Sequence, residues 1–330
     1  MINRRPFKKR LGRLDANKIT VFYSDTKTSV WSLGKGLCTT LSSMGYVVVD
    51  APASAMPEQY ILDNQDMILV SGPEYLWERL RAKYPNWDQL KAKKYGWMHE
   101  TVEREDYASN PIARDGTLPV ADVKRLTPHV FTPAAQDTKY GFVYLPFGVD
   151  TKVFTPSVEK DAEIVFIGSM YGKRRVFMEN NPQVSVLGGT KDYLMYKSDL
   201  EFSAYLRYTT RAMAVLNLPT LSLLNSTRVY EAMACKALTI TPLMGGHPDN
   251  YSMFKDRVHL LYYQGSPVEV MNSVIEVVYT GDNNPRGSNR GHSRIWHYAI
   301  NKTAKDIAEA GYEEVKKNHT LESRLEKILR

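Results

Sequence analysis

The sequence predicts an α/β protein with two doubly wound parallel sheets, one in each of two domains that face a cleft. Short β-branched or aromatic runs alternate with helical stretches along most of the chain, and this alternation is typical of parallel sheets whose strands are connected by helices. The alternation stops in a segment rich in Pro, Gly and turn residues at 144–162 and then starts again. The length of 330 residues also suits two domains, each of roughly 150 residues.

The first domain is expected at residues 1–150, where residues 1–17 form a basic arm. The strands predicted from its β-branched and aromatic runs lie at 17–24, 46–52, 66–72, 94–100, 129–134 and 142–147. Residues 29–46 place apolar side chains at helical spacing and predict the first helix. Residues 46–52 read YVVVDAP without polar alternation, so we expect this strand to be buried on both faces.

The second domain is expected at residues 151–294. The strands predicted there lie at 163–169, 185–189, 213–219, 237–242 and 258–263, separated by helical stretches. Residues 295–330 are mostly charged and amphipathic, and they predict C-terminal helices. Ligands of such folds bind outside the carboxyl ends of the strands, so we expect the functional residues there.

The composition is that of a soluble globular protein, with 43% hydrophobic and 24% charged residues. No apolar run reaches the roughly 20 residues that a membrane helix needs, and no apolar segment of a secretory signal follows the basic start. Cys38 and Cys235 are far apart and are expected to be buried thiols in a reducing compartment. These observations predict a cytoplasmic location without membrane partners.

The net charge of +7 is concentrated in the N-terminal arm. Its cationic residues are Arg4, Arg5, Lys8, Lys9, Arg10 and Arg13. Such an arm can bind a polyanion such as DNA through phosphate contacts and counterion release. The alternative is a solvated end that only keeps the protein soluble.

A glycine and a basic cluster follow the first strand of the second domain. Gly168 and Ser169 end the strand, and Lys173 and Arg174 then open a predicted helix. Glycine permits close approach of the backbone, and cationic side chains with free amides suit a diphosphate. The spacing fits no standard phosphate-binding motif, so a surface turn with a basic helix face is the alternative.

A second candidate site is the start of the helix in STRVYEAMACKALTIT, at 226–241. Ser226 and Thr227 are residue types that begin helices, where backbone amides can hold phosphate. Arg228 and Glu231 are three residues apart and share one face of the helix. Glu231 could accept two hydrogen bonds from vicinal hydroxyls of a ribose. The alternative is a solvent-exposed ion pair between Arg228 and Glu231, of little energetic value.

Loops at the carboxyl ends of other strands supply further polar residues. Gly246 and His247 follow the strand at 237–242. In the first domain, Asp25 follows the first strand, and His99 and Glu100 end the strand at 94–100. Any of these three could be a general base that faces the cleft, although a structural role is the alternative for each.

The sequence lacks the motifs of several enzyme classes, which argues against their chemistry. The sequence has no Asp-x-Asp pair of a metal-dependent sugar transferase, no HExxH and no Gly-x-Ser-x-Gly. Two cysteines cannot form a zinc knuckle. We therefore expect a metal-independent site, without a cofactor, that uses basic side chains and helix termini.

Four segments carry a resemblance to a known family. YLPFGVDTKVFTP, FIGSMYGKRR, STRVYEAMACKALTITP and GGHPDN resemble the donor-binding half of GT-B glycosyltransferases, most closely the group-1-like and CgeB-like (spore-coat type) members. HTLESRLEKIL resembles their C-terminal helix, which crosses back to the first domain. The resemblance implies a GT-B fold of two Rossmann-like domains, with residues 295–330 packed on the N-terminal domain.

The resemblance also implies roles for individual residues. Glu231 matches the family glutamate that binds the nucleotide ribose. The residues that match the diphosphate-binding segments are Gly168, Ser169, Lys173, Arg174, Ser226, Thr227 and Arg228. Gly246 and His247 match the loop that approaches the donor sugar. The chain has Leu223 where retaining members carry a second glutamate, and Lys236 where they carry glycine, so the stereochemical outcome stays open.

The implied activity is transfer of a hexose or pentose from a nucleotide sugar, with a UDP-sugar as the expected co-substrate, to an acceptor hydroxyl. The basic arm favours DNA with hydroxymethylated pyrimidines, as in phage-type DNA modification, which would act in the host cytoplasm and require base flipping. The alternative acceptor is a saccharide or a cell-surface or spore polymer. A second alternative is a non-catalytic nucleotide- or DNA-binding protein on the same fold.

Overall fold

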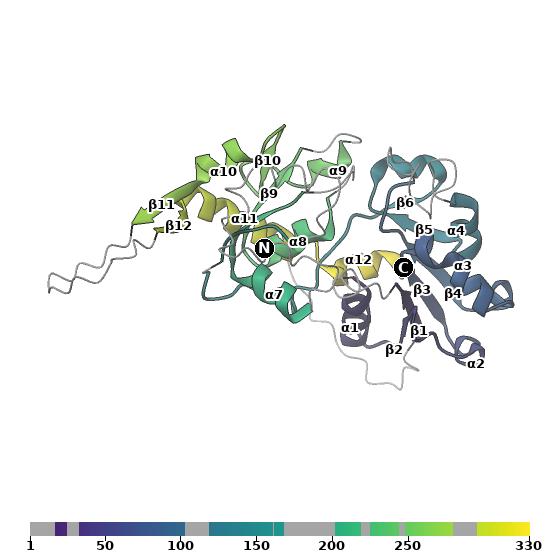
Figure 1. The fold of residues 1–330 in the computed structure, drawn as a ribbon. Coiled ribbons are helices and arrows are strands. Elements are labelled where there is room, and N and C mark those ends of the chain that lie inside the picture. Colours follow the sequence, from purple (N-terminus) through teal and green to yellow (C-terminus); the bar gives the residue numbers. More distant parts are fainter. Residues whose placement is uncertain are drawn as a thin grey trace, which may run out of the picture.

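The computed structural model has two lobes, each built on a parallel sheet (Figure 1). It describes residues 17–24, 33–102, 119–160, 162–167, 202–218, 225–243, 248–279 and 296–330. Helices and parallel strands alternate in both lobes. The predicted α/β fold class is thereby confirmed, whereas the domain boundaries at 150 and 294 stay our proposal.

The first sheet has the strand order β2-β1-β3-β4-β5-β6, and all its neighbouring strands are parallel. Its strands are β1 (Lys18–Tyr23), β2 (Val47–Pro52), β3 (Met67–Ser71), β4 (Lys93–Trp97), β5 (His129–Thr132) and β6 (Val143–Tyr144). All six lie where the sequence predicts them. The order reverses between β1 and β3, and the carboxyl ends at such a switch point are where ligands bind in doubly wound sheets.

The prediction that β2 is buried on both faces is wrong. β2 lies at the edge of the sheet, and Val47 is 51% exposed while only Ala51 of this strand is buried. The buried strands are instead β1 and β3, which have neighbours on both sides. An apolar run shows that a strand can be buried, but its place in the sheet decides whether it is.

The helices of the first lobe are α1 (Lys35–Ser43), α2 (Gln59–Leu62), α3 (Pro73–Lys83) and α4 (Val120–Leu126). The 3₁₀ segment η2 (Trp87–Gln89) lies between α3 and β4, and η4 (Ala135–Tyr140) lies between β5 and β6. Leu37 and Leu41 of α1 pack in one hydrophobic core with Ile19 and Val21 of β1. Cys38 is also buried there, and burial raises the pKa of its thiol to about 12.

The second sheet has the order β10-β9-β8-β7, again parallel throughout. Its strands are β7 (Ala162–Val165), β8 (Ala212–Leu216), β9 (Leu238–Pro242) and β10 (Leu261–Tyr263). The helices of this lobe are α7 (Phe202–Arg211), α8 (Thr227–Ala234), α9 (Asp249–Ser252) and α10 (Val268–Val274). The strand predicted at 185–189 lies outside the described residues.

The sequence predicts only helices in residues 295–330, but the structure also has a strand there. β12 (Trp296–Ile300) pairs antiparallel with β11 (Ile275–Tyr279), and the helices α11 (Lys302–Asn318) and α12 (Leu321–Ile328) follow. Residues 296–300 read WHYAI, and aromatic and β-branched residues favour strands. The helix starts where the Asn301 side chain accepts a hydrogen bond from the Ala304 amide, 2.9 Å away.

The C-terminal helix α12 packs against α1 of the first lobe. The chain before it forms a parallel bridge, in which the Val149 amide donates to the His319 carbonyl over 3.0 Å and the Leu321 amide donates to the Val149 carbonyl over 3.0 Å. Arg324 is only 3% exposed and donates to the carbonyl oxygens of Pro146 (2.7 Å) and of its neighbour Phe147 (3.2 Å). The chain that joins the two lobes is therefore held by α12.

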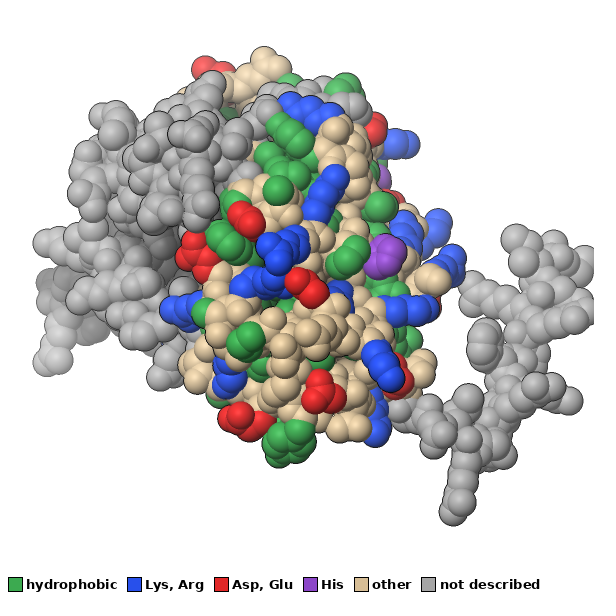
Figure 2. Space-filling view, turned by 90° about the vertical axis from the view of Figure 1, so that its right-hand side faces the viewer, with side chains coloured by type: hydrophobic (Ala, Val, Ile, Leu, Met, Phe, Trp, Pro, Cys, Tyr) green, Lys and Arg blue, Asp and Glu red, His purple; other side chains and the backbone are tan. Residues whose placement is uncertain are grey.

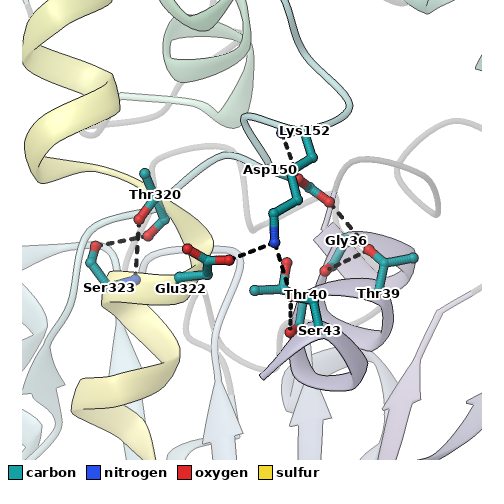
Figure 3. A network of polar contacts seen from close by, with 9 residues as sticks. All are labelled: Gly36, Thr39, Thr40, Ser43, Asp150, Lys152, Thr320, Glu322 and Ser323. Atoms are coloured by element: carbon teal, nitrogen blue, oxygen red, sulfur yellow. Dashed lines mark hydrogen bonds and ion pairs between the residues drawn. The ribbon is translucent and has the colours of Figure 1, made fainter. Parts of the chain in front are cut away.

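Figure 3 shows a polar network where α1, α12 and the joining chain meet. The Lys152 ammonium donates to the Glu322 carboxylate of α12 over 2.7 Å and to the Ser43 hydroxyl of α1 over 3.0 Å. Thr39 of α1 donates to the Asp150 carboxylate over 3.2 Å. These contacts fix the joining chain to the first lobe on one side and to the C-terminal helix on the other.

The exposed face of the molecule in Figure 2 carries Lys and Arg side chains with Asp and Glu between them. Among the described residues of the first lobe, Arg81 of α3 forms an ion pair with Asp88. No helix within the described ranges combines the length and the apolar character that crossing a membrane would require.

Candidate functional site

Helix α8 begins where the sequence predicts, with Ser226 as the N-cap residue. Its hydroxyl does not cap the helix; it donates to the Asn217 side-chain oxygen over 3.1 Å. Val229 and Met233 are buried, so the opposite side of α8 is fixed in the core. The first amides of a helix have no partner within it and attract anions, so this helix start can bind phosphate.

Arg228 is held in the first turn of α8 by two contacts. Its Nη1 donates to the Asn217 Oδ1 atom over 2.9 Å, and its guanidinium lies 5.6 Å from the ring centre of Phe166. Its Nε is buried and has no hydrogen-bond partner among the described residues. A buried guanidinium donor of this kind is costly unless a ligand satisfies it.

Glu231 lies one turn further along α8 and is only 3% exposed. It accepts a hydrogen bond from the Tyr205 hydroxyl of α7. Burial, followed by the nearby Glu231 charge, raises the pKa of Tyr205 well above its usual value, so this hydroxyl stays a donor. The interpretation of Arg228 and Glu231 as a solvent-exposed ion pair is therefore wrong.

Several predicted donor residues lie outside the described residues: Gly168, Ser169, Lys173, Arg174, Gly246 and His247. Their flanking residues are described. Ile167 follows β7, and Leu243 follows β9. Since β7, β8 and β9 are parallel neighbours, these two residues leave the sheet at the same edge as Asn217.

His99 and Glu100 follow β4 at the carboxyl edge of the first sheet. The His99 Nε2 atom is 2.8 Å from the Ser71 hydroxyl, which ends β3. Burial lowers the pKa of His99 to about 4, so the imidazole is neutral at pH 7 and its protonated form is disfavoured. Glu100 accepts a hydrogen bond from the Tyr75 hydroxyl over 2.9 Å. The third predicted base, Asp25, lies outside the described residues.

Sequence reasoning missed Glu74, which organises the loop of His99 and Glu100. Its Oε1 atom accepts hydrogen bonds from the His99 amide (2.7 Å) and the Glu100 amide (3.1 Å). Glu74 is 1% exposed, and burial raises the pKa of its carboxyl to about 8. Its sequence signal was weak, because Glu in the first turn of a helix such as α3 is ordinary.

Asn217 and Tyr205 were also missed. Asn217 is fully buried directly after β8, and a polar residue that ends a buried strand is a usable signal. Tyr205 had none, because it lies on another helix than Glu231 and is 26 residues away from it in the sequence. The structure thus brings Ser226, Arg228 and Glu231 together on α8, while His99 and Glu100 lie in the other lobe.

The whole chain is similar in fold to solved glycosyltransferases at low sequence identity. Alr3699/HepE of Anabaena, in complex with UDP-glucose, matches with a TM-score of 0.58 and 11% identity over 94% of this chain and 98% of that protein. A glycosyltransferase from Rickettsia africae matches with a TM-score of 0.53 and 12% identity over 96% and 97%. An α-glucosyltransferase in complex with UDP and a mismatched 13-mer DNA matches with a TM-score of 0.54 and 10% identity over 94% and 98%.

These neighbours show a GT-B fold with two Rossmann-like domains. No curated protein matches the sequence. Residues 163–330, about half of the chain, match the family described as glycosyl transferase-like, and they include α8 and its Arg228 and Glu231. The chain therefore belongs to the glycosyl transferase-like family.

Proposed function

We propose that this protein transfers a sugar from a UDP-sugar to an acceptor hydroxyl without a metal ion. The observation that carries the proposal is the arrangement on α8: a buried carboxylate at Glu231 lies one turn after a guanidinium at Arg228 that still has unused donors. The solved complexes of a structural neighbour with UDP and UDP-glucose support the choice of nucleotide.

The donor would lie along the start of α8. The Glu231 carboxylate accepts the ribose hydroxyls, and the first amides of α8 with Arg228 receive the diphosphate. Glu231 has a fixed orientation because Tyr205 donates to its other oxygen, Oε2. The remaining residues assigned to this donor site by resemblance are Gly168, Ser169, Lys173, Arg174, Gly246 and His247. Together the cationic side chains and backbone amides of this site stabilise the negative charge that develops on the leaving diphosphate.

The acceptor would bind at the carboxyl edge of the first sheet. If transfer inverts the anomeric carbon, a base must take the proton of the acceptor hydroxyl, and Asp25, His99 and Glu100 are the candidates. His99 contacts the Ser71 hydroxyl at this edge, but burial lowers its pKa to about 4 and makes it a weak base at pH 7. The two lobes exclude water when they close on the donor, which limits its hydrolysis.

DNA that contains hydroxymethylated pyrimidines is the acceptor that we favour. The net charge of +7 and the cationic arm at residues 1–17 suit a polyanion. A structural neighbour has been solved with both UDP and DNA. A saccharide or surface polymer is the competing acceptor, and Leu223 in place of a family glutamate is the feature that favours a non-catalytic protein.

The test combines a nucleoside mass analysis with a measurement of free UDP. Hydroxymethylated and unmodified DNA are incubated separately with the protein and a mixture of UDP-sugars. A hexose or pentose mass gain on the hydroxymethylated base alone supports the proposal in full. Released UDP without a mass gain would support a transferase activity but exclude this acceptor. The absence of both released UDP and a mass gain would contradict the proposed activity.

The role of the arm is tested by reversing its charge at Arg4, Arg5, Lys8 and Lys9. The expected result is a strong loss of transfer to DNA at moderate salt, while the affinity for UDP is unchanged because the donor site is untouched. Unchanged transfer to DNA would exclude the arm as the DNA contact.

A further inference from the structure

Asn217 contacts two hydrogen-bond donors at the start of α8, the Ser226 hydroxyl and the Arg228 guanidinium. Its Oδ1 atom accepts one hydrogen bond from the Ser226 hydroxyl over 3.1 Å and another from Arg228 Nη1 over 2.9 Å. Asn217 itself is fully buried. A ligand at the helix start would therefore meet Ser226 and Arg228, while Asn217 lies behind them.

The other side of Asn217 is fixed to the sheet. Its Nδ2 atom donates to the Thr241 hydroxyl of β9 over 2.9 Å, and its backbone amide donates to the Ile240 carbonyl over 2.8 Å. Thr241 is fully buried as well. Because Nδ2 is committed to β9, the amide plane has one orientation and Oδ1 faces α8.

The contact to Nη1 determines which part of the guanidinium is left for a ligand. Nε and Nη2 form the side-on fork that binds two oxygens of one phosphate, and Nη1 lies outside this fork. Asn217 bonds Nη1, and neither Nε nor Nη2 has a hydrogen-bond partner among the described residues. Phe166 supports the guanidinium plane. The guanidinium of Arg228 is thus held in place, while its fork is not paired with any described residue.

We infer that Asn217 is a positioning residue for the donor diphosphate, which orients the fork of Arg228 and the hydroxyl of Ser226. The inference rests on the proposed function, and it assigns Asn217 no contact with the donor. A free arginine side chain loses up to about 2 kcal/mol of rotamer entropy when it is fixed. Asn217 places that cost in the folding of the protein, so that phosphate binding does not incur it.

An amide suits this position better than a carboxylate. An Asp at position 217 would accept the same two hydrogen bonds, but its negative charge would pair with Arg228 and repel the phosphate. Thr241 could donate to its second oxygen, so Asn217→Asp is expected to fold. Asn217→Ala removes the acceptor altogether and leaves Arg228 and Ser226 without their anchor.

The test compares the affinities for UDP and for uridine by calorimetric titration. Uridine offers its ribose to Glu231 but has no phosphate for Arg228. For Asn217→Ala and Asn217→Asp we expect the affinity for UDP to fall about tenfold or more, as for the loss of a charged hydrogen bond. The affinity for uridine should stay within about threefold of wild type. The ratio of the two affinities is a readout that a loss of stability alone does not change.

Two controls make the result specific. Thr239→Val alters a buried residue of the same strand as Thr241, whose hydroxyl donates to the Ala237 carbonyl, and should leave the ratio unchanged. In an Arg228→Ala background, Asn217→Ala should lower the affinity for UDP much less than it does in wild type, because it acts through Arg228.

If both Asn217 variants keep the wild-type ratio, the inference is overturned while the proposed function stands. If the wild-type protein binds neither UDP nor uridine, the proposed function fails and the inference falls with it.

Discussion

The substitution Glu74→Gln should make the protein more stable at alkaline pH. Glu74 is 1% exposed, and its Oε2 atom has no hydrogen-bond partner among the described residues. Burial, with a smaller contribution from the Glu100 charge, raises the pKa of this carboxyl from 4.5 to about 8. The folded protein therefore holds a proton on Glu74 over a range of pH in which the unfolded chain has released it.

The sign and the magnitude follow from this difference. Between pH 4.5 and about 8 the folded state binds more protons than the unfolded state, so the free energy of unfolding falls as the pH rises. The slope is about 1.4 kcal/mol per pH unit, and the shift of the pKa gives a total of about 5 kcal/mol. Gln is neutral at every pH and keeps an oxygen for the His99 and Glu100 amides.

The assay is urea unfolding of wild type and Glu74→Gln at pH 5, 7 and 9. The variant should match wild type closely at pH 5 and exceed its free energy of unfolding by about 3 kcal/mol or more at pH 9. Glu78→Gln makes the same exchange at an exposed position of α3 and controls for it. A stability difference between Glu74→Gln and wild type that is constant from pH 5 to 9 would refute the reasoning.

Three further substitutions test the packing around the site. Lys236 has a φ of 57° at the end of α8, where an L-residue is strained. Lys236→Gly should therefore raise the free energy of unfolding, measured in urea, by about 0.5–1 kcal/mol. This gain is expected even though the substitution removes the exposed ion pair with Glu309. A lower value than wild type would show that the pair matters more than the strain. Arg324→Lys cannot replace the guanidinium bonds to the joining chain, and it should cost about 3 kcal/mol or more; an unchanged thermal midpoint would exclude this role of Arg324. Gly311→Ala would place a Cβ 2.3 Å from a backbone carbonyl oxygen, so it should destabilise the protein by about 1–2 kcal/mol despite the better helix propensity of Ala, and a gain in stability would contradict that contact.

Much of the fold could be predicted because its signals are local. β-branched runs marked the strands of the first sheet, and Ser226 marked the start of α8. The misread elements depend on non-local information. The exposure of β2 follows from its place at the edge of the sheet, and β12 forms because β11 lies beside it, although the WHYAI sequence already favoured a strand.

The candidate site could be predicted only in part for the same reason. Arg228 and Glu231 were recognised because their spacing on one helix is local. The groups that orient them come from elsewhere in the chain: Asn217 from the end of β8 and Tyr205 from α7. Likewise, Glu74 of α3 holds a loop that is 25 residues away. The position of Asn217 after a buried strand is a sequence signal, but its partners, like those of Tyr205 and Glu74, depend on the sheet order and the helix packing.

Binding of UDP to wild type and to Glu231→Gln tests the central claim most directly. Gln keeps the size of the side chain and can still accept from Tyr205, but a neutral amide is a weaker acceptor for ribose hydroxyls than a carboxylate. A calorimetric titration should show one UDP site in wild type and an affinity lower by about tenfold or more in Glu231→Gln. Equal affinities in the two proteins, or no binding of UDP by wild type, would contradict the assignment of α8 as the donor site.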